Sequence, residues 1–152
     1  MKKKFTILIA DRNRHVRDFL MREMMKEGYD VWVAKNGGEI LDWIFHNDYF
    51  DLLILDPDLR DAAEIKIIEI LNERKPSIPV IVHAFLSDYN NHLEIFNASA
   101  YVEKQGDSIE RLKDEVSRLL EKFKPPGGNK SENDIFGQPL GRQDRNQRKG
   151  KK

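Results

Sequence analysis

The stretch LLILDPDLR, residues 52–60, joins four aliphatic residues to an acid, a proline and a second acid. A short continuous apolar run of this kind is typical of a strand that is buried on both faces, as in the parallel sheets of α/β proteins. We therefore expect a strand over residues 51–55. Its tip would present Asp56 at the carboxyl edge of the sheet, where ligands bind in open α/β folds.

Short β-rich runs alternate with longer segments of helical spacing on both sides of this strand, which is the pattern of an α/β fold. Strands are predicted at residues 5–10, 29–34, 51–55, 78–84 and 99–104. Helices are predicted at residues 16–24 with a stop at Gly28, and at residues 40–45, 62–74, 87–97 and 109–123. Because crossovers between parallel strands are right-handed, this order predicts a single domain with a doubly wound, five-stranded parallel sheet of the flavodoxin-like type.

The composition fits a soluble globular protein, with 39% hydrophobic and 34% charged residues in a chain of 152. No apolar run approaches the roughly 20 residues that cross a membrane, and the first residues lack a secretory signal. We therefore expect a cytoplasmic protein without a membrane partner. The absence of cysteine excludes a disulfide framework, a thiol nucleophile and a zinc-thiolate site.

Charge is distributed unevenly along the chain. Residues 1–124 hold 19 Lys and Arg against 23 Asp and Glu, whereas residues 125–152 hold 7 against 3. The second segment is rich in Pro, Gly, Asn and Gln, so we predict a folded domain at 1–124 and a disordered basic tail at 125–152. A solvating tail is favoured over weak, salt-dependent binding of nucleic acid, which is not an expected partner.

Polar residues follow the predicted strands at the points where they end. Since the carboxyl ends of parallel strands meet at one edge of a sheet, these side chains should line one crevice. They are Asp11 and Arg12, Asp56 and Asp58, His83, and Lys104. The other histidines, His15, His46 and His92, lack the spacing of metal ligands and are interpreted as surface residues.

Four stretches occur in a characteristic order: ILIADRNRHVRDFL at 7–20, FDLLILDPDLR at 50–60, IPVIVHA at 78–84 and NASAYVEK at 97–104. Because of these four stretches and their order, residues 5–124 resemble the receiver domain of the two-component response regulators. The resemblance implies a phosphorelay signalling module rather than an enzyme. Its partners would be a histidine kinase or phosphotransfer protein and a downstream signalling protein. No output domain of helix-turn-helix type follows in the sequence, so we expect a stand-alone module.

The resemblance also assigns roles at the crevice. Asp56 would accept a phosphoryl group from a histidine of the partner kinase. A divalent metal would lie between Asp56, an acidic pair that includes Asp11, and the backbone carbonyl of Asp58. Lys104 and the residue at the end of the fourth strand, here His83, would contact the phosphoryl oxygens.

The aromatic residue of the fifth strand, Tyr101, matches the position of the family's rotamer switch, although a place in the core is the favoured alternative. Two further positions depart from the family pattern. Gln105 replaces the usual proline, and residues 59–65 lack the family's glycine-containing turn.

The most informative departure is Arg12, which stands where the family has the second acid of its pair. A guanidinium group has only donors and stays protonated, so it repels Mg²⁺ and reaches instead for Asp56 or Asp11. We interpret Arg12 as a fixed positive charge in place of the metal, so no cofactor is expected, and Mg²⁺ is the disfavoured alternative. The alternative is an exposed arginine at the start of a helix.

His83 departs as well, because an imidazole is larger than a hydroxyl group and titrates near neutral pH. A buried structural histidine is the alternative to a phosphoryl contact at this position. Together these departures leave open whether Asp56 is phosphorylated. In an altered receiver, the face formed by residues 87–97, 99–104 and the last helix would bind its partner without phosphorylation. A nucleotide- or cofactor-binding enzyme on the same sheet is the alternative function, but residues 10–15 contain no glycine-rich phosphate loop.

Overall fold

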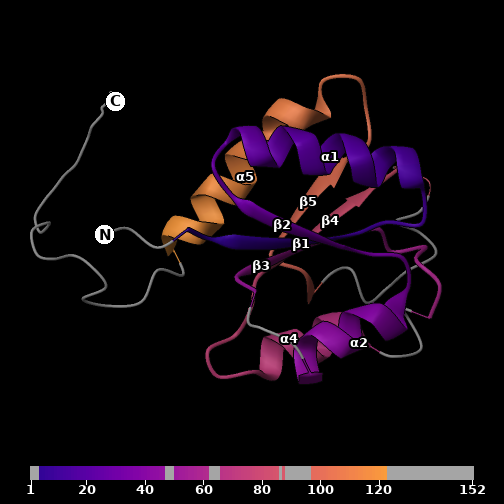
Figure 1. Ribbon diagram of the computed structural model, residues 1–152, viewed down its shortest axis with the longest axis vertical. Coiled ribbons are helices and arrows are strands. Elements are labelled where there is room, and N and C mark those ends of the chain that lie inside the picture. The colour runs from indigo at the N-terminus through magenta and orange to yellow at the C-terminus, as the bar shows by residue number, and fades with distance from the viewer. Residues whose placement is uncertain (1–3, 47–49, 62–65, 86, 88–96, 123–152) are drawn as a thin grey trace, which may run out of the picture. The chain divides into compact units, whose positions relative to one another are not determined.

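The computed structural model describes residues 4–46, 50–61, 66–85, 87 and 97–122. The chain divides into a compact unit, residues 1–120, and a second unit, residues 121–152. The compact unit is built around one sheet of parallel strands, with helices on both of its faces (Figure 1).

The sheet contains five strands in the order β2-β1-β3-β4-β5. Their bounds are β1 Thr6–Ala10, β2 Asp30–Ala34, β3 Leu52–Leu55, β4 Val80–Ala84 and β5 Ala100–Glu103. Every pairing is parallel, and Ala10 pairs with Leu55 at the carboxyl ends of β1 and β3. The predicted doubly wound sheet is therefore confirmed.

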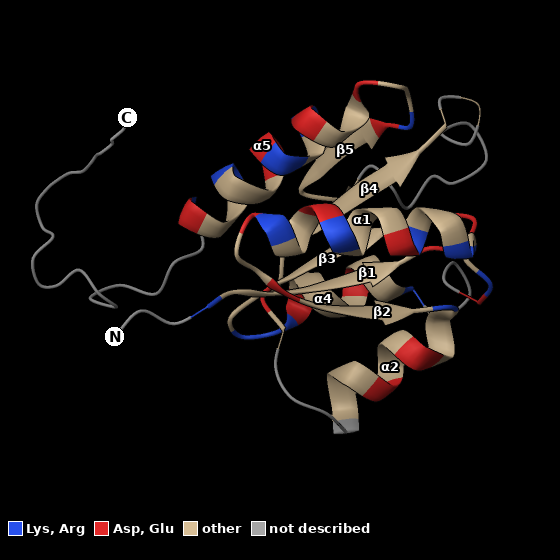
Figure 2. Ribbon diagram, turned by 45° about the horizontal axis from the view of Figure 1, so that its top comes forward, with Lys and Arg blue, Asp and Glu red and all other residues tan. Residues whose placement is uncertain are grey.

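Helices α1 (Arg14–Lys26) and α5 (Ser108–Lys122) cover one face of the sheet, and α2 (Gly37–His46) and α4 (Ile67–Glu73) cover the other (Figure 1). Strand β3 is buried along its whole length and supplies both cores. Leu53 and Leu55 pack on the side of α2 and α4, while Leu52 and Ile54 pack on the side of α1 and α5. Helices α1 and α5 both carry residues of either charge along their length (Figure 2).

Helix α1 begins and ends with capping groups that the sequence supplies locally. The Asn13 side chain accepts hydrogen bonds from the backbone N–H groups of His15 and Val16. Gly28 adopts a φ of 95°, and the N–H groups of Gly28 and Tyr29 donate to the carbonyls of Met25 and Met24. This is the Schellman arrangement, and it confirms the predicted stop at Gly28.

The helix predicted over residues 62–74 is wrong at Lys66, and the described helix α4 runs from Ile67 to Glu73. Lys66 has a φ of 61° and a ψ of 50°, a left-handed conformation that cannot continue a right-handed helix. The rest of this prediction, residues 62–65, lies outside the described residues.

Two further predictions concern residues that the structure does not describe, apart from residues 87 and 97. They are the helix at 87–97 and the tail at 125–152. Among the helices that the structure describes, none is both long and apolar enough to span a membrane.

Candidate functional site

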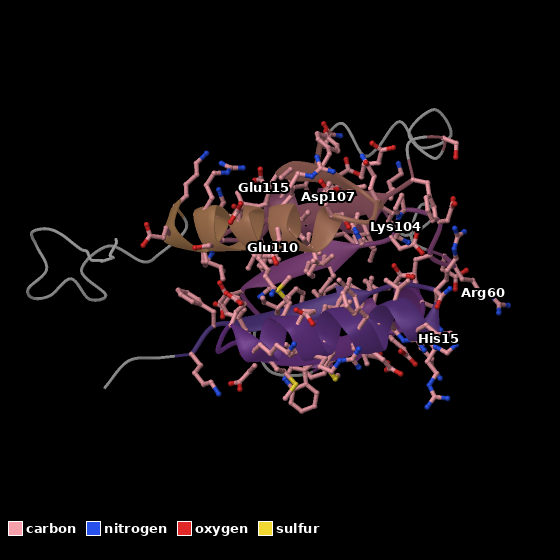
Figure 3. All side chains as sticks on the ribbon, turned by 90° about the horizontal axis from the view of Figure 1, so that it is seen from above. His15, Arg60, Lys104, Asp107, Glu110 and Glu115 are labelled. Carbon is pink, nitrogen blue, oxygen red and sulfur yellow. The ribbon has the colours of Figure 1, made fainter. Side chains whose placement is uncertain are left out.

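Three residues of the predicted crevice are positioned by backbone hydrogen bonds that extend the sheet beyond its strands. The N–H of Asp56 donates to the carbonyl of Ala10 at 2.9 Å, and the N–H of Lys104 donates to that of Ala84 at 2.8 Å. Asp11 is held in the same way by the carbonyl of Ala34, at 3.3 Å. The sheet therefore brings these side chains together at its carboxyl edge, where Figure 3 shows Lys104.

Asp56 is buried, with 1% of its surface exposed. Its carboxylate accepts two backbone hydrogen bonds, from Asp58 to Oδ1 at 3.0 Å and from Arg12 to Oδ2 at 3.2 Å. Burial raises the pKa of Asp56, and the neighbouring charge of Asp11 raises it further, while Lys104 and the two backbone donors act in the opposite direction. Asp56 is thus a buried carboxyl that gives up its proton less readily than an exposed one.

Lys104 forms the inner ion pair of the site. Its Nζ atom lies 3.0 Å from Oδ2 of Asp11 and 3.9 Å from Oδ2 of Asp56, and its side chain is 9% exposed. The same Nζ atom lies 5.3 Å from the centre of the Phe85 ring. One buried ammonium group therefore faces two buried carboxylates.

Arg12 forms the outer ion pair. Its Nε atom lies 3.4 Å from Oδ2 of Asp56, and its Nη1 atom lies 3.0 Å from Oδ2 of Asp58. The Arg12 side chain is 48% exposed and that of Asp58 is 25% exposed, so this pair is more accessible to water than the inner one. The predicted approach of Arg12 to an acid of the crevice is present, and the guanidinium joins two of them.

The acids of this edge lie against positive side chains of the chain itself. Mg²⁺ requires several oxygen ligands that converge on one point. Within the described ranges, no group of three or more acidic or histidine side chains is placed to hold a metal ion. Asp56 and Asp58 instead face the guanidinium of Arg12, which can only donate hydrogen bonds.

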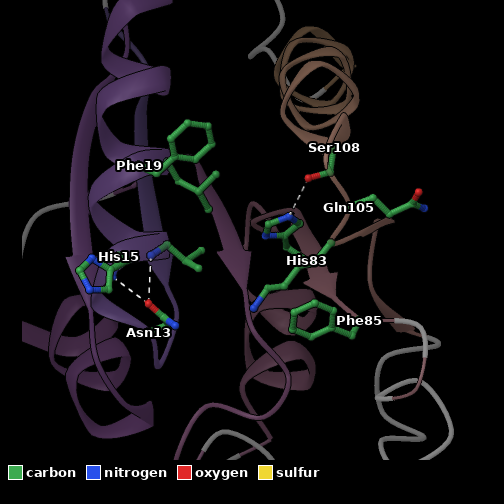
Figure 4. A pocket seen from close by; sticks show the side chains of 10 residues that line it. Asn13, His15, Phe19, His83, Phe85, Gln105 and Ser108 are labelled. Carbon is green, nitrogen blue, oxygen red and sulfur yellow. Dashed lines mark hydrogen bonds between the residues drawn. The ribbon is translucent and has the colours of Figure 1, made fainter.

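His83 ends β4 and is buried, with 5% of its surface exposed. Its Nε2 atom lies 3.4 Å from Oγ of Ser108 at the start of α5 (Figure 4), while Nδ1 has no hydrogen-bond partner among the residues that the structure describes. Burial lowers the pKa of His83 to about 4, the Lys104 charge lowers it as well, and Asp56 acts in the opposite direction. The imidazole is therefore uncharged at neutral pH.

Tyr101 lies on β5 and is 40% exposed, so the alternative of a core residue is wrong. Partial burial raises the pKa of its hydroxyl group. Gln105, which follows Lys104, donates from Nε2 to Oε1 of Glu103 at 2.7 Å. Both side chains lie outside the buried cluster of Asp11, Asp56 and Lys104.

Several residues that shape the site were not predicted from the sequence. Asn13 donates its backbone N–H to Oδ1 of Asp11 at 2.9 Å, and Nη1 of Arg17 donates to the Asp11 carbonyl at 2.8 Å. An asparagine just before a helix is a recognised capping signal, so the role of Asn13 could have been found. Phe85 and Ser108 gave no comparable signal.

The fold and this edge cluster define a signalling module of the receiver class. The model of the family described as "Response regulator receiver domain" matches residues 7–117. The chain therefore belongs to the response regulator receiver domain family, as the resemblance implied.

Individual relatives give the same result. The chain is 31% identical over 94 residues to response regulator RR06 of Streptococcus pneumoniae, covering 62% of this chain and 42% of that protein. It is 29% identical over 121 residues to response regulator MprA of Mycobacterium avium, covering 78% and 52%. The chain thus spans about half, or less, of the length of these curated relatives.

Among solved structures, response regulator TrrA of Thermotoga maritima in complex with Mg(2+)-BeF has a TM-score of 0.67 and is 29% identical, covering 76% of this chain and 99% of that one. TrrA in complex with the histidine kinase ThkA has a TM-score of 0.63 at 30% identity, covering 76% and 98%.

Proposed function

We propose that this receiver acts in two-component signalling through protein binding, with the fixed charge of Arg12 in place of a metal ion and without depending on phosphorylation of Asp56. The observation that carries the proposal is the position of the guanidinium. It lies 3.4 Å from Asp56, an acid whose charge a dication would otherwise offset, and 3.0 Å from the neighbouring Asp58.

Electrostatics support a stable cluster. An ion pair at about 4 Å is worth roughly 4 kcal/mol before desolvation at an effective dielectric constant near 20. The inner pair of Lys104 and Asp11 is shielded from water and from salt, because both side chains are less than one-tenth exposed. Together with Arg12, these charges hold the ends of β1, β3 and β5 in one arrangement.

The chemistry of His83 supports the same proposal. A receiver that switches moves a small hydroxyl group toward the phosphoryl oxygens, as the family resemblance implies. Here the corresponding side chain is a buried, uncharged imidazole whose Nε2 already faces Ser108. Such a ring contacts α5 and is too large to follow the movement of a hydroxyl group.

The partners that we propose are a histidine kinase or phosphotransfer protein and a downstream signalling protein. The relative TrrA forms a complex with the histidine kinase ThkA, which supports a kinase partner here. For the downstream protein we propose the face that includes β5 and α5. The exposed ring of Tyr101 lies on this face.

Phosphorylation with a small donor tests the proposal. The full chain, its Asp56→Asn variant and its Arg12→Asp variant are incubated with acetyl phosphate and Mg²⁺, and adducts are measured by intact mass. We expect no phosphate adduct on the native chain. The Arg12→Asp variant, which restores the acidic pair, should gain an adduct that a second change, Asp56→Asn, removes. A labile adduct on the native chain that disappears in Asp56→Asn would overturn the proposal.

A further inference from the structure

Strand β2 forms one outer edge of the sheet, with β1 as its neighbour and β5 at the opposite edge (Figure 2). Edge strands expose unpaired backbone groups, and proteins commonly guard them with proline, lysine or a bulge. The five residues of β2, DVWVA, include neither proline nor lysine, and each of them pairs with β1 in an unbroken register. This edge is therefore open to pairing with a further strand.

Hydrogen bonds at the two ends of β2 show which of its backbone groups point outward. The N–H of Asp30 donates to the carbonyl of Phe5 at 3.0 Å, and the carbonyl of Ala34 accepts at 3.3 Å from the N–H that directly follows β1. The first and last residues of β2 therefore direct their backbone groups to β1. Because this direction alternates along a strand, the N–H and C=O groups of Val31 and Val33 point away from β1, at the edge of the sheet.

Trp32, in the middle of β2, adds an apolar surface to this edge. The residue is 52% exposed, although its ring centre lies only 5.0 Å from that of Trp43 on α2. Trp32 pairs with Leu8, so its side chain lies on the face of the sheet that α2 and α4 cover. Aromatic side chains that lie directly opposite each other on paired strands stabilise the pairing. The edge thus offers backbone hydrogen bonds and an aromatic contact at the same place.

The charges that flank β2 favour a second copy of this chain as the partner. The strand begins with Asp30, whose carboxylate is 54% exposed and lies 3.4 Å from Nζ of Lys4, and it is followed directly by the exposed Lys35. When two β2 strands pair antiparallel, Asp30 of each copy comes beside Lys35 of the other, and the like charges lie at opposite ends. The edge is therefore complementary in charge to itself.

We propose that two copies of this chain associate through β2, as an antiparallel pair of strands with its twofold axis at Trp32. In this register Val31 of each copy pairs with Val33 of the other, so four N–H···O=C bonds join the copies. The two Trp32 side chains lie opposite each other. Such a symmetric contact is closed, which limits the assembly to a dimer. Because β5 lies at the other edge of the sheet, the inference is independent of the proposed partner face and of phosphorylation.

Sedimentation velocity of the full chain tests the proposal. Two strands of five residues bury less than the roughly 1,600 Å² of a standard interface, so the dimer should be weak. The chain should be monomeric at about 10 µM and largely dimeric at about 1 mM.

A pair of variants at Val33 tests the backbone pairing. Val33→Pro removes an N–H that the sheet itself does not use, and with it two of the four bonds between the copies. At about 1 kcal/mol for each bond, the dissociation constant should rise about 30-fold. Val33→Thr is the matched control, because it keeps both the N–H and the β-branched shape, and it should dimerise like the native chain.

Cysteine cross-linking tests the register, since the native chain contains no cysteine. Trp32→Cys places two thiols on opposite residues whose Cα atoms lie about 4.5 Å apart, within the range of a disulfide. With oxidised glutathione as the oxidant, this variant should form a linked dimer. Lys35→Cys is the matched control, because its two thiols would lie six residues out of register, roughly 20 Å apart, and should stay unlinked.

Three results would each overturn the proposal. They are a native chain that stays monomeric at the higher concentration, a dimer that Val33→Pro leaves unchanged, and linking of Lys35→Cys that is as fast as that of Trp32→Cys. If Val33→Pro does not fold, the two cysteine variants decide.

Discussion

Replacing Lys104 by methionine removes the one ammonium group that faces both Asp11 and Asp56 among the described residues, at 3.0 and 3.9 Å. Methionine keeps most of the apolar stem but leaves two buried carboxylates without this charge. Breaking a buried pair by removing one partner costs about 3–5 kcal/mol. Because domains unfold with a free energy of about 5–15 kcal/mol, the variant should lose a large part of its stability.

The outer ion pair provides the matched control. Arg12 is 48% exposed, and pairs accessible to water contribute about 0.2–1 kcal/mol, so Arg12→Gln should cost 1 kcal/mol or less. In urea denaturation with an m-value of about 2 kcal/mol/M, the midpoint should fall by about 2 M for Lys104→Met and by less than about 0.5 M for Arg12→Gln.

The pH dependence and a double variant complete the test. Lys104 lowers the pKa of Asp56, so its removal raises that pKa further and the loss of stability should shrink as the pH falls from 7.5 to 5. The double variant Asp11→Asn and Lys104→Met should recover most of the stability that Lys104→Met alone loses. The electrostatic reasoning is refuted if Lys104→Met costs no more than Arg12→Gln at pH 7.5.

Three further predictions follow from the buried groups and the backbone. The pKa of Asp56 is raised, so the contribution of this group to stability is complete below pH 3.8 and is lost as the pH rises. The native protein should therefore lose stability relative to Asp56→Asn between pH 4 and pH 7. Parallel pH profiles of stability for the two proteins would contradict this prediction. For His83 the pH dependence has the opposite sign, because its pKa is lowered to about 4 and its contribution to stability is therefore present above pH 6.5. As the pH falls from 6.5 to 4, the native protein should lose about 3 kcal/mol of unfolding free energy relative to His83→Gln, as measured by denaturant titrations. An imidazole ¹⁵N titration with a midpoint near 6.5 would show this to be wrong. Lys66→Gly should raise the free energy of unfolding by about 1 kcal/mol, because glycine adopts the left-handed conformation without strain; a lower melting temperature of the variant would count against it.

The sheet and the clustering of charged residues at its carboxyl edge were predictable, because both depend on the hydrophobic period and on the order of strands and helices along the chain. The buried run of β3 has no alternation, and parallel strands leave their carboxyl ends at one edge, so Asp11, Asp56 and Lys104 had to lie near one another. The start of α4 was not predictable, since apolar spacing continues through Lys66 while its backbone turns left-handed. The capping role of Asn13 has a local sequence signal, but the left-handed backbone of Lys66 does not.

The directions in which the side chains of the site point could not be predicted from the sequence. The residue after a strand can point to either side, so both directions remained open for Arg12 until its contacts with Asp56 and Asp58 were seen. The contact between His83 and Ser108 joins residues 25 positions apart, on different elements. No local pattern encodes such a pair, because it depends on how α5 packs against the sheet.

The charge balance of the site links these observations to signalling. Asp11, Asp56 and Asp58 face the ammonium group of Lys104 and the guanidinium of Arg12, so three carboxylates meet two positive charges. Within this set, burial and the neighbouring charge of Asp11 raise the pKa of Asp56. A phosphoryl group would add negative charge at this buried position, next to the Arg12 guanidinium that contacts both Asp56 and Asp58. We propose that phosphorylation competes with the present contacts of Arg12, and that Arg12→Asp, which restores the acidic pair, is the change that most directly makes Asp56 reactive.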